Sequence, residues 1–174
     1  MASYHFLMSS LPMLRSEATL PISYDKFLSY SKSAVSNSTY ELLEGLTIDS
    51  DKGPLISEWA KFYSAFKKEL TYQRSKKANV SAPQPFDIDA EVKKAITAAI
   101  NDKNPLNAEN ALLAIQFDKL DSLIGIHAFD DHALFGYALK LKLLERRTVF
   151  DEASGKKELN RLVDGLEEQI KGIN

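Results

Sequence analysis

The sequence contains no cysteine, and this absence excludes several kinds of site at once. Without a thiol there is no disulfide framework, no thiolate nucleophile and no cysteine-bound zinc. Glycine and proline are also scarce, at 7 and 6 of 174 residues, so the chain has little of the punctuation that a many-stranded fold requires. No glycine-rich phosphate loop occurs, and no stretch alternates apolar and polar residues for long enough to predict a β-hairpin.

Neither the charge nor the hydrophobicity of the chain is extreme. The formal net charge is −2 and the pI is about 5.9, so the chain as a whole has no electrostatic footprint for nucleic acid. No apolar run approaches the ~20 residues needed to cross a bilayer. Residues 1–14 lack a basic start, and His5, Ser9 and Ser10 interrupt their apolar stretch, which is atypical of a signal peptide. We therefore expect a cytoplasmic protein that meets a membrane only indirectly, through its partners.

The sequence does contain helical periodicity and enough apolar residues to build a core. With 44% hydrophobic and 26% charged residues, a chain of this length suits one globular domain. We predict an all-α fold, a compact bundle of about seven or eight helices in a single domain spanning residues 1–174. The segment 79–88 contains two prolines and no periodicity. An arrangement of two lobes, 1–78 and 89–174, joined by this connector therefore stays open.

Helix-capping residues predict where the first helices begin and end. A short helix near residues 3–10 should end before Pro12, because proline cannot continue the hydrogen-bond ladder. Ser23 has the side chain of an N-cap and precedes an apolar run. Ser38 and Glu41 have the spacing of a capping box, in which each side chain accepts from the other residue's backbone N–H. We therefore predict helices that begin near residues 23 and 38.

Later helices have similar start signals. Pro54 suits the first turn of a helix at roughly 55–77, while Asp89 and the pair Asn104 and Pro105 suit the starts of the next two. The helix at 55–77 has one broad apolar face, which consists of Ile56, Trp59, Phe62, Phe66 and Leu70. The helix after Pro105 has a packing seam, which consists of Leu113, Phe117, Leu120, Ile124 and His127.

The helix predicted after Asp130 differs from the others because it is apolar on two sides. One stripe consists of Ala133, Tyr137, Leu141 and Leu144, and the other of Phe135, Leu139 and Leu143. A helix with two apolar faces is normally sandwiched between neighbours, so we expect this one at the centre of the core. Residues 151–155 should break the chain, and an amphipathic helix at 159–170 should close it.

Two histidines and two aspartates, His127, Asp130, Asp131 and His132, fall within six positions. Imidazole and carboxylate groups bind metal ions, but a metal site needs three or four convergent ligands, and this cluster spans two helices. A structural interpretation is simpler: Asp130 caps the second helix, Asp131 favours its positive end, and the histidines pack near the turn. We therefore predict no metal site and no cofactor, with a metal-binding protein as the alternative.

We also predict that the protein is not an enzyme and has no catalytic residues. Asp118 and Asp121 share a helix with Glu109, but no activated serine, histidine-backed nucleophile or phosphate loop accompanies them. Basic residues end two of the long helices, where they complement the helix dipole and are candidates for a partner contact. These candidates are Arg74, Lys76, Lys77, Lys140, Lys142, Arg146 and Arg147.

Four segments of the chain, taken in order, resemble a known family. They are "YHFLMSSLPML" (4–14), "LPISYDKFL" (20–28), "LDSLIGIHAFDDHALFGYALKLKLLERR" (120–147) and "FDEASGKKELNRLVDGL" (150–166). The sharpest elements are Tyr4, Leu7, Ser10, Leu11, Pro12 and Leu14, with the pair Pro21 and Phe27. These segments resemble a small family of all-helical bacterial proteins encoded with V-type ATPase genes. Members of that family are in turn similar to a shortened C (d) subunit of A/V-type rotary ATPases.

The resemblance implies a non-enzymatic helical subunit or accessory protein of a bacterial V-type ATPase that translocates H+ or Na+. The C subunit is an all-helical adaptor that sits on the membrane rotor ring and receives the central stalk. The chain is about half as long as that subunit, with room for one or two of its three helical units. We expect it to link or assemble the rotor ring and central stalk, with other V-type ATPase subunits as partners, at the inner face of the plasma membrane. The alternative outside this class is a helical scaffold or regulatory protein unrelated to the ATPase.

Overall fold

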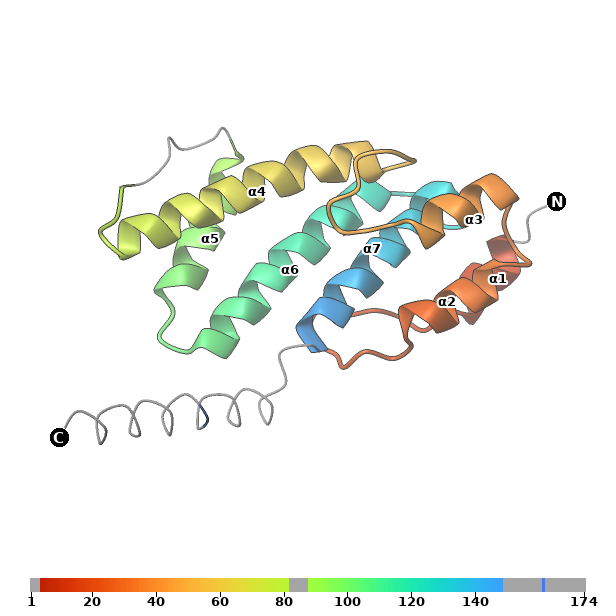
Figure 1. Cartoon of the computed structure of the whole chain (residues 1–174), viewed down its shortest axis with the longest axis horizontal. Coiled ribbons are helices and arrows are strands. Elements are labelled where there is room, and N and C mark those ends of the chain that lie inside the picture. Colours follow the sequence, from red (N-terminus) through yellow and green to blue (C-terminus); the bar gives the residue numbers. More distant parts are fainter. Residues whose placement is uncertain (1–3, 82–87, 149–160, 162–174) are drawn as a thin grey trace.

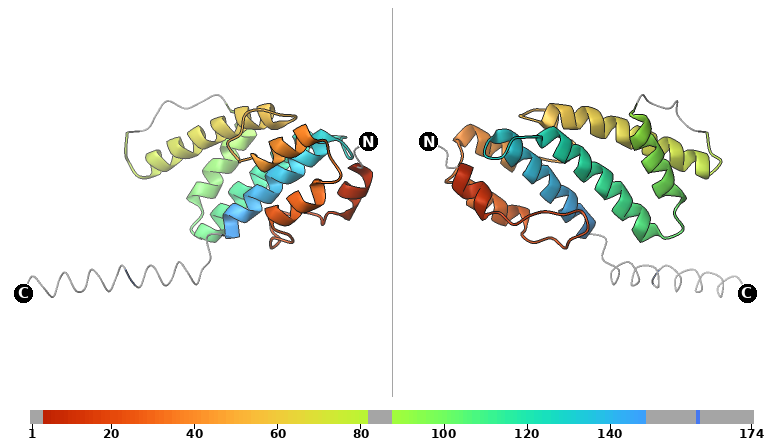
Figure 2. Two further views of the ribbon diagram at one scale, coloured as in Figure 1. Left: turned by 45° about the vertical axis from the view of Figure 1, so that its right-hand side comes forward. Right: turned by 180° about the vertical axis from the view of Figure 1, so that it is seen from behind.

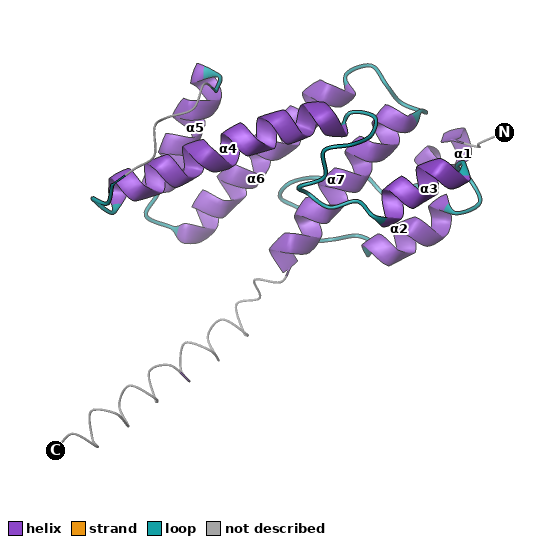
Figure 3. Ribbon diagram, turned by 45° about the horizontal axis from the view of Figure 1, so that its top comes forward, coloured by secondary structure: helices purple, strands orange, loops and turns teal. Residues whose placement is uncertain are grey.

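The computed structural model describes residues 4–81, 88–148 and Arg161. The described residues form seven α-helices and no strand, which confirms the predicted all-α fold (Figure 3). None of the described helices is both long enough and apolar enough to cross a membrane. Most of the predicted connector at 79–88, the break at 151–155 and nearly all of the closing helix at 159–170 lie outside the described residues.

The helices pack as a bundle in which segments far apart in the sequence lie side by side. In chain order they are α1 (Tyr4–Ser10), α2 (Tyr24–Ser31), α3 (Asn37–Glu44), α4 (Ile56–Lys77), α5 (Ala90–Asn101), α6 (Pro105–Ile124) and α7 (Asp131–Thr148). α7 contacts α6 on one side and the two short helices α2 and α3 on another, and α5 packs against both α4 and α6 (Figure 1). The N-terminal helices α2 and α3 therefore pack against α7, the last helix that the structure describes.

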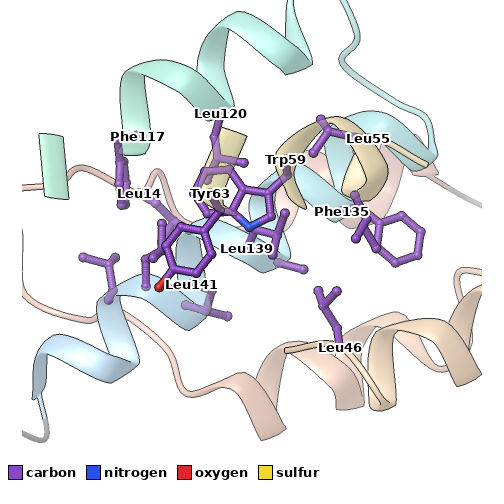
Figure 4. Packing of buried hydrophobic residues seen from close by; sticks show 14 of the residues in the cluster. Leu14, Leu46, Leu55, Trp59, Tyr63, Phe117, Leu120, Phe135, Leu139 and Leu141 are labelled. Atoms are coloured by element: carbon purple, nitrogen blue, oxygen red, sulfur yellow. The ribbon is translucent and has the colours of Figure 1, made fainter. Parts of the chain in front are cut away.

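α7 is the centre of the core, as its two apolar stripes predict. All seven stripe residues except the half-buried Tyr137 are buried, and Phe135, Leu139 and Leu141 have no exposed surface. Trp59 of α4 is also fully buried and lies with Leu120 and Leu139 in the same cluster (Figure 4). The indole Nε1 of Trp59 donates a hydrogen bond to a backbone carbonyl at 3.0 Å, so its polar atom is satisfied inside the core.

Three of the predicted helix starts are confirmed by their capping hydrogen bonds. The Ser23 hydroxyl accepts from the backbone N–H of the third residue after it and caps α2. Asp89 accepts from two backbone N–H groups at the start of α5. Asn104 caps α6 in the same way, and Pro105 occupies the first helical position, where its missing N–H costs nothing.

The predicted start of α3 is wrong by two residues. Ser36, rather than Ser38, is the N-cap, and its hydroxyl accepts from the backbone N–H of Thr39 at 3.1 Å. Glu41 therefore lies in the second turn of the helix, too far along to complete a capping box with the N-cap Ser36. Thr39 and Leu43 lie one turn apart on the buried side of α3.

The role predicted for Pro54 is also wrong. Pro54 lies two residues before the first residue of α4, and Leu55 takes the N-cap position without a side-chain hydrogen bond. Leu55 has a φ of 63° and Gly53 a φ of 132°, so the chain turns sharply before the helix begins. This turn lets both Leu55 and Ile56 enter the core, where they are 5% and 1% exposed. Their burial offsets the cost of the left-handed backbone at Leu55.

Candidate functional site

The connection between α6 and α7 carries the cluster of histidines and aspartates. α6 ends at Ile124, and Gly125, with a φ of 54°, turns the chain away from the helix axis. His127 is therefore exposed and not the last member of the α6 seam, which corrects the prediction. The connection lies at the same end of the molecule as the first described residues of α1 (Figure 2). As predicted, Asp130 caps α7, with Oδ1 accepting from the backbone N–H of Ala133 at 3.0 Å.

The structure brings three of the four clustered residues together. His127 Nδ1 contacts Asp130 Oδ2, and the rings of His127 and His132 are stacked with their centroids 4.5 Å apart and an interplanar angle of 14°. One potential ligand atom from each of these three residues lies within 4.8 Å of the other two. The side chains of His127 and Asp130 are 42% and 45% exposed, so the cluster is open to solvent.

Electrostatics favour the ionised form of Asp130. Partial burial acts to raise the pKa of its carboxyl group. This effect is outweighed by the hydrogen bond from the Ala133 backbone N–H and by the proximity of His127 and His132, so the pKa of Asp130 lies below its ordinary value. Asp130 is therefore a carboxylate over the whole neutral range of pH.

The fourth residue of the cluster, Asp131, belongs to a different contact. Its Oδ1 accepts a hydrogen bond from the hydroxyl of Tyr4, which ties α1 to the first turn of α7. Burial and then the neighbouring Asp131 carboxylate raise the pKa of Tyr4 to about 12. The ring of His5 lies 3.9 Å from that of Phe129, centroid to centroid, so α1 also packs against the loop between α6 and α7. His5 thus supports the loop through stacking.

The first two basic residues of α7 contact groups of the chain itself. Lys140 is only 8% exposed, its Nζ pairs with the Asp121 carboxylate, and it lies 5.3 Å from the ring centroid of Phe117. Lys142 Nζ lies 3.5 Å from the ring centroid of Tyr24, which is a cation–π contact with α2. Both cations therefore join α7 to neighbouring helices.

The last two basic residues of α7 also have internal partners. Arg146 Nη1 donates to the Tyr63 hydroxyl at 2.8 Å, which joins α7 to α4. The guanidinium of Arg147 donates to the backbone carbonyls of Ser16 and Ala18, in the connector between α1 and α2. Arg147 thus satisfies two carbonyls that belong to no helix.

The basic residues at the end of α4 are more exposed, and they lie apart from those at the end of α7 (Figure 1). Arg74 pairs with Glu109 of α6 at 3.4 Å, and both side chains are more than half exposed. Lys77 Nζ donates to the backbone carbonyl of Ile100, and Lys76 is exposed. These three residues remain candidates for a partner contact.

Exposed apolar side chains near α1 form a feature that the sequence analysis missed. Phe6 and Met13 are 77% and 76% exposed, although the residues that follow them, Leu7 and Leu14, are buried. Phe6 and Leu7 line a hollow between α1 and α2, together with Tyr30. The signal in the sequence is a large apolar residue directly before each buried leucine. Phe6 and Leu7 are neighbours in α1, and neighbouring positions in a helix face different directions.

The chain was compared with protein-family models, curated proteins and solved structures, and none of them matches.

The two carboxylates considered for acid–base chemistry are not paired with each other: Asp121 contacts Lys140, and Asp118 is exposed. Function is therefore inferred from the surface near α1 and from the cluster of His127, Asp130 and His132.

Proposed function

We propose that the chain is a non-enzymatic helical subunit or accessory protein of a bacterial V-type ATPase, which links or assembles the rotor ring and the central stalk. The proposal rests first on the resemblance of the N-terminal segment 4–14 and the later segments to the family encoded with V-type ATPase genes. Such a role requires a surface that binds other proteins and no reaction centre.

The observation that carries the proposal is the arrangement of the N-terminal segment 4–14, in which some side chains are buried in the core and others are exposed. Leu7 and Leu14 anchor the segment in the core, and Pro12 accepts a hydrogen bond from Tyr137 through its carbonyl at 3.0 Å. Phe6 and Met13 of the same segment are largely exposed. Burying a side chain of this size in an interface stabilises a complex by about 1.5–3 kcal/mol. Residues that resemble the family therefore hold two apolar side chains ready for a partner surface.

Affinity purification from the native host tests the proposal. The tagged chain should recover V-type ATPase subunits, and Phe6→Ser and Met13→Ser should each reduce that recovery, because both remove apolar contact area. Leu106→Ser is the matched control, since Leu106 is 65% exposed but lies at the start of α6. All three variants should keep the circular dichroism spectrum of the unmodified chain.

Two outcomes would contradict the proposal. Repeated absence of the chain from an intact, active ATPase complex would remove the ATPase as its partner. Equal recovery of ATPase subunits with Phe6→Ser, Met13→Ser and Leu106→Ser would move the contact away from the α1 surface.

A further inference from the structure

The cluster of His127, Asp130 and His132 has the geometry of a set of metal ligands. Their potential ligand atoms lie within 4.8 Å of one another. Two ligands that each lie ~2.1 Å from a tetrahedral ion are about 3.4 Å apart, so the longest separation must shorten by about 1.4 Å. Small rotations of the two histidine side chains shorten this separation, while Asp130 keeps Oδ1 on the Ala133 backbone N–H and the partly exposed His127 has room to turn.

The backbone already holds the ligand residues in place. The His127 backbone N–H donates to the Ile124 carbonyl at 3.0 Å, and the Ala133 N–H binds Asp130 Oδ1. Asp130 therefore uses one oxygen to cap α7 and presents the other, Oδ2, to His127. An ion bound at Oδ2 leaves the helix cap intact. The ion takes the place of the contact between His127 Nδ1 and Asp130 Oδ2.

The donor atoms select the class of ion. Two imidazole nitrogens and one carboxylate oxygen suit divalent first-row transition metals, whereas Mg²⁺ and Ca²⁺ prefer oxygen ligands. The positive end of the α7 dipole opposes a bound cation, but the carboxylates of Asp130 and Asp131 lie at that end and offset it. With three protein ligands, a tetrahedral ion keeps one position for water or for a group from another molecule.

We propose that His127, Asp130 and His132 bind one divalent transition-metal ion, Zn²⁺ or a close relative of it, where α6 turns into α7. The bound ion joins the exposed loop to the first turn of α7. It thereby orders the segment that carries Ile126 and Phe129, which are 100% and 43% exposed. This inference does not depend on the proposed role in an ATPase.

Calorimetric titration of the tag-free chain with ZnCl₂ and with MgCl₂ tests the site. Zn²⁺ should bind with a stoichiometry of one and a Kd in the micromolar range or tighter, and Mg²⁺ should give no binding. His127→Ala and His132→Ala should each weaken Zn²⁺ binding at least tenfold, since each removes one of three ligands. Asp130→Asn should weaken it while keeping α7 capped, because asparagine is an equally good N-cap.

The third histidine of the chain provides the matched control. His5→Ala removes a ring that stacks on Phe129 but supplies no ligand, so Zn²⁺ should bind this variant as it binds the unmodified chain. In the unmodified chain, imidazole NMR signals of His127 and His132 should shift on addition of one equivalent of Zn²⁺. This second measurement needs no substitution and therefore does not depend on whether a variant folds.

Three results would overturn the inference. One is the absence of Zn²⁺ binding at high micromolar protein concentration. Another is unchanged affinity in both His127→Ala and His132→Ala. The third is an NMR response to Zn²⁺ that is confined to signals other than those of His127 and His132.

Discussion

Substitution of Gly136 tests how closely α7 packs against the end of α6, next to the loop that connects the two helices. Gly136 is the only glycine within α7 and is buried against the end of α6. A Cβ atom added at Gly136 would lie 2.4 Å from Cγ1 and 2.5 Å from Cδ1 of Ile124, while its distance to a Leu55 methyl would be an ordinary 3.6 Å. Gly136→Ala therefore places one methyl group into space that Ile124 occupies.

Two opposing effects decide whether Gly136→Ala raises or lowers the free energy of unfolding. Alanine is better than glycine in a helix interior by about 1 kcal/mol, which favours the variant. Apolar carbon atoms normally lie about 3.5–4.0 Å apart, so the new methyl overlaps Ile124 by more than 1 Å. Overpacking of this kind costs about 1–3 kcal/mol, and the β-branched Ile124 side chain has few alternative rotamers to relieve it. We expect a net loss of about 1 kcal/mol in the free energy of unfolding.

Urea denaturation followed by circular dichroism and by the fluorescence of Trp59, the single tryptophan, measures this loss. The corresponding fall in Tm is about 2–4 °C for a chain of this size. In an Ile124→Ala background the overlapping atoms are gone, so Gly136→Ala should instead raise stability by about 1 kcal/mol. Gly45→Ala is the control, because its Cβ would meet nothing closer than 3.6 Å. A stabilising effect of Gly136→Ala in both backgrounds would refute the close contact of α6 and α7.

Further predictions concern a buried carboxylate and the tyrosines. Glu69 is fully buried, with Oε1 accepting from Gln73 at 2.6 Å and Oε2 without a hydrogen bond from the residues that the structure describes. Glu69→Met should therefore raise the free energy of unfolding by about 1–3 kcal/mol in urea denaturation, and a lower value would contradict this. Burial raises the pKa of Tyr4 and Tyr137 to about 12, and burial with Glu145 raises that of Tyr24 still further. Absorbance at 295 nm should therefore report at least three un-ionised tyrosines in the folded chain at pH 11, whereas all seven tyrosines should be ionised in guanidinium. Because unfolded tyrosine ionises near pH ~10, the folded chain binds more protons above that pH, and stability should fall between pH ~10 and ~12; seven ionised tyrosines in the folded chain would contradict the burial of these hydroxyls.

Local signals in the sequence predicted most of the helix starts correctly. Asn104 is distinguished from the nearby Asp102 by Pro105, which follows it and suits the first helical position, and this pair starts α6 as expected. Asp89 likewise starts α5 as expected. The start of α3 lies in a serine-rich run, where Ser36 and Ser38 are both suitable N-caps and the capping-box spacing of Ser38 and Glu41 favours the wrong one. The hydrogen bond from the Thr39 backbone N–H to the Ser36 hydroxyl distinguishes the two serines, and it is known only from the folded chain.

The candidate metal site shows a different limit of the sequence. The three ligand residues are close neighbours in the chain, but their convergence depends on α6 ending at Ile124. A helix continued to His127 would turn that side chain toward the core, as the predicted seam required. Gly125 prevents this by adopting a positive φ. The separation of Asp131 from the cluster could not be predicted either, because its partner Tyr4 lies 127 residues away.

Because the basic residues of α7 contact other groups of the same chain, a different surface is better suited to bind a partner. A lysine such as Lys140, buried and paired with Asp121, offers little charge to another protein, whereas Phe6 offers a large apolar surface at no cost in broken contacts. Phe6 follows His5, whose ring stacks on Phe129 in the loop of the metal ligands. A partner that covers Phe6 therefore lies beside that loop. If the ion and the partner both favour the ordered loop, each must increase the affinity of the other by the same factor, since such coupling is reciprocal.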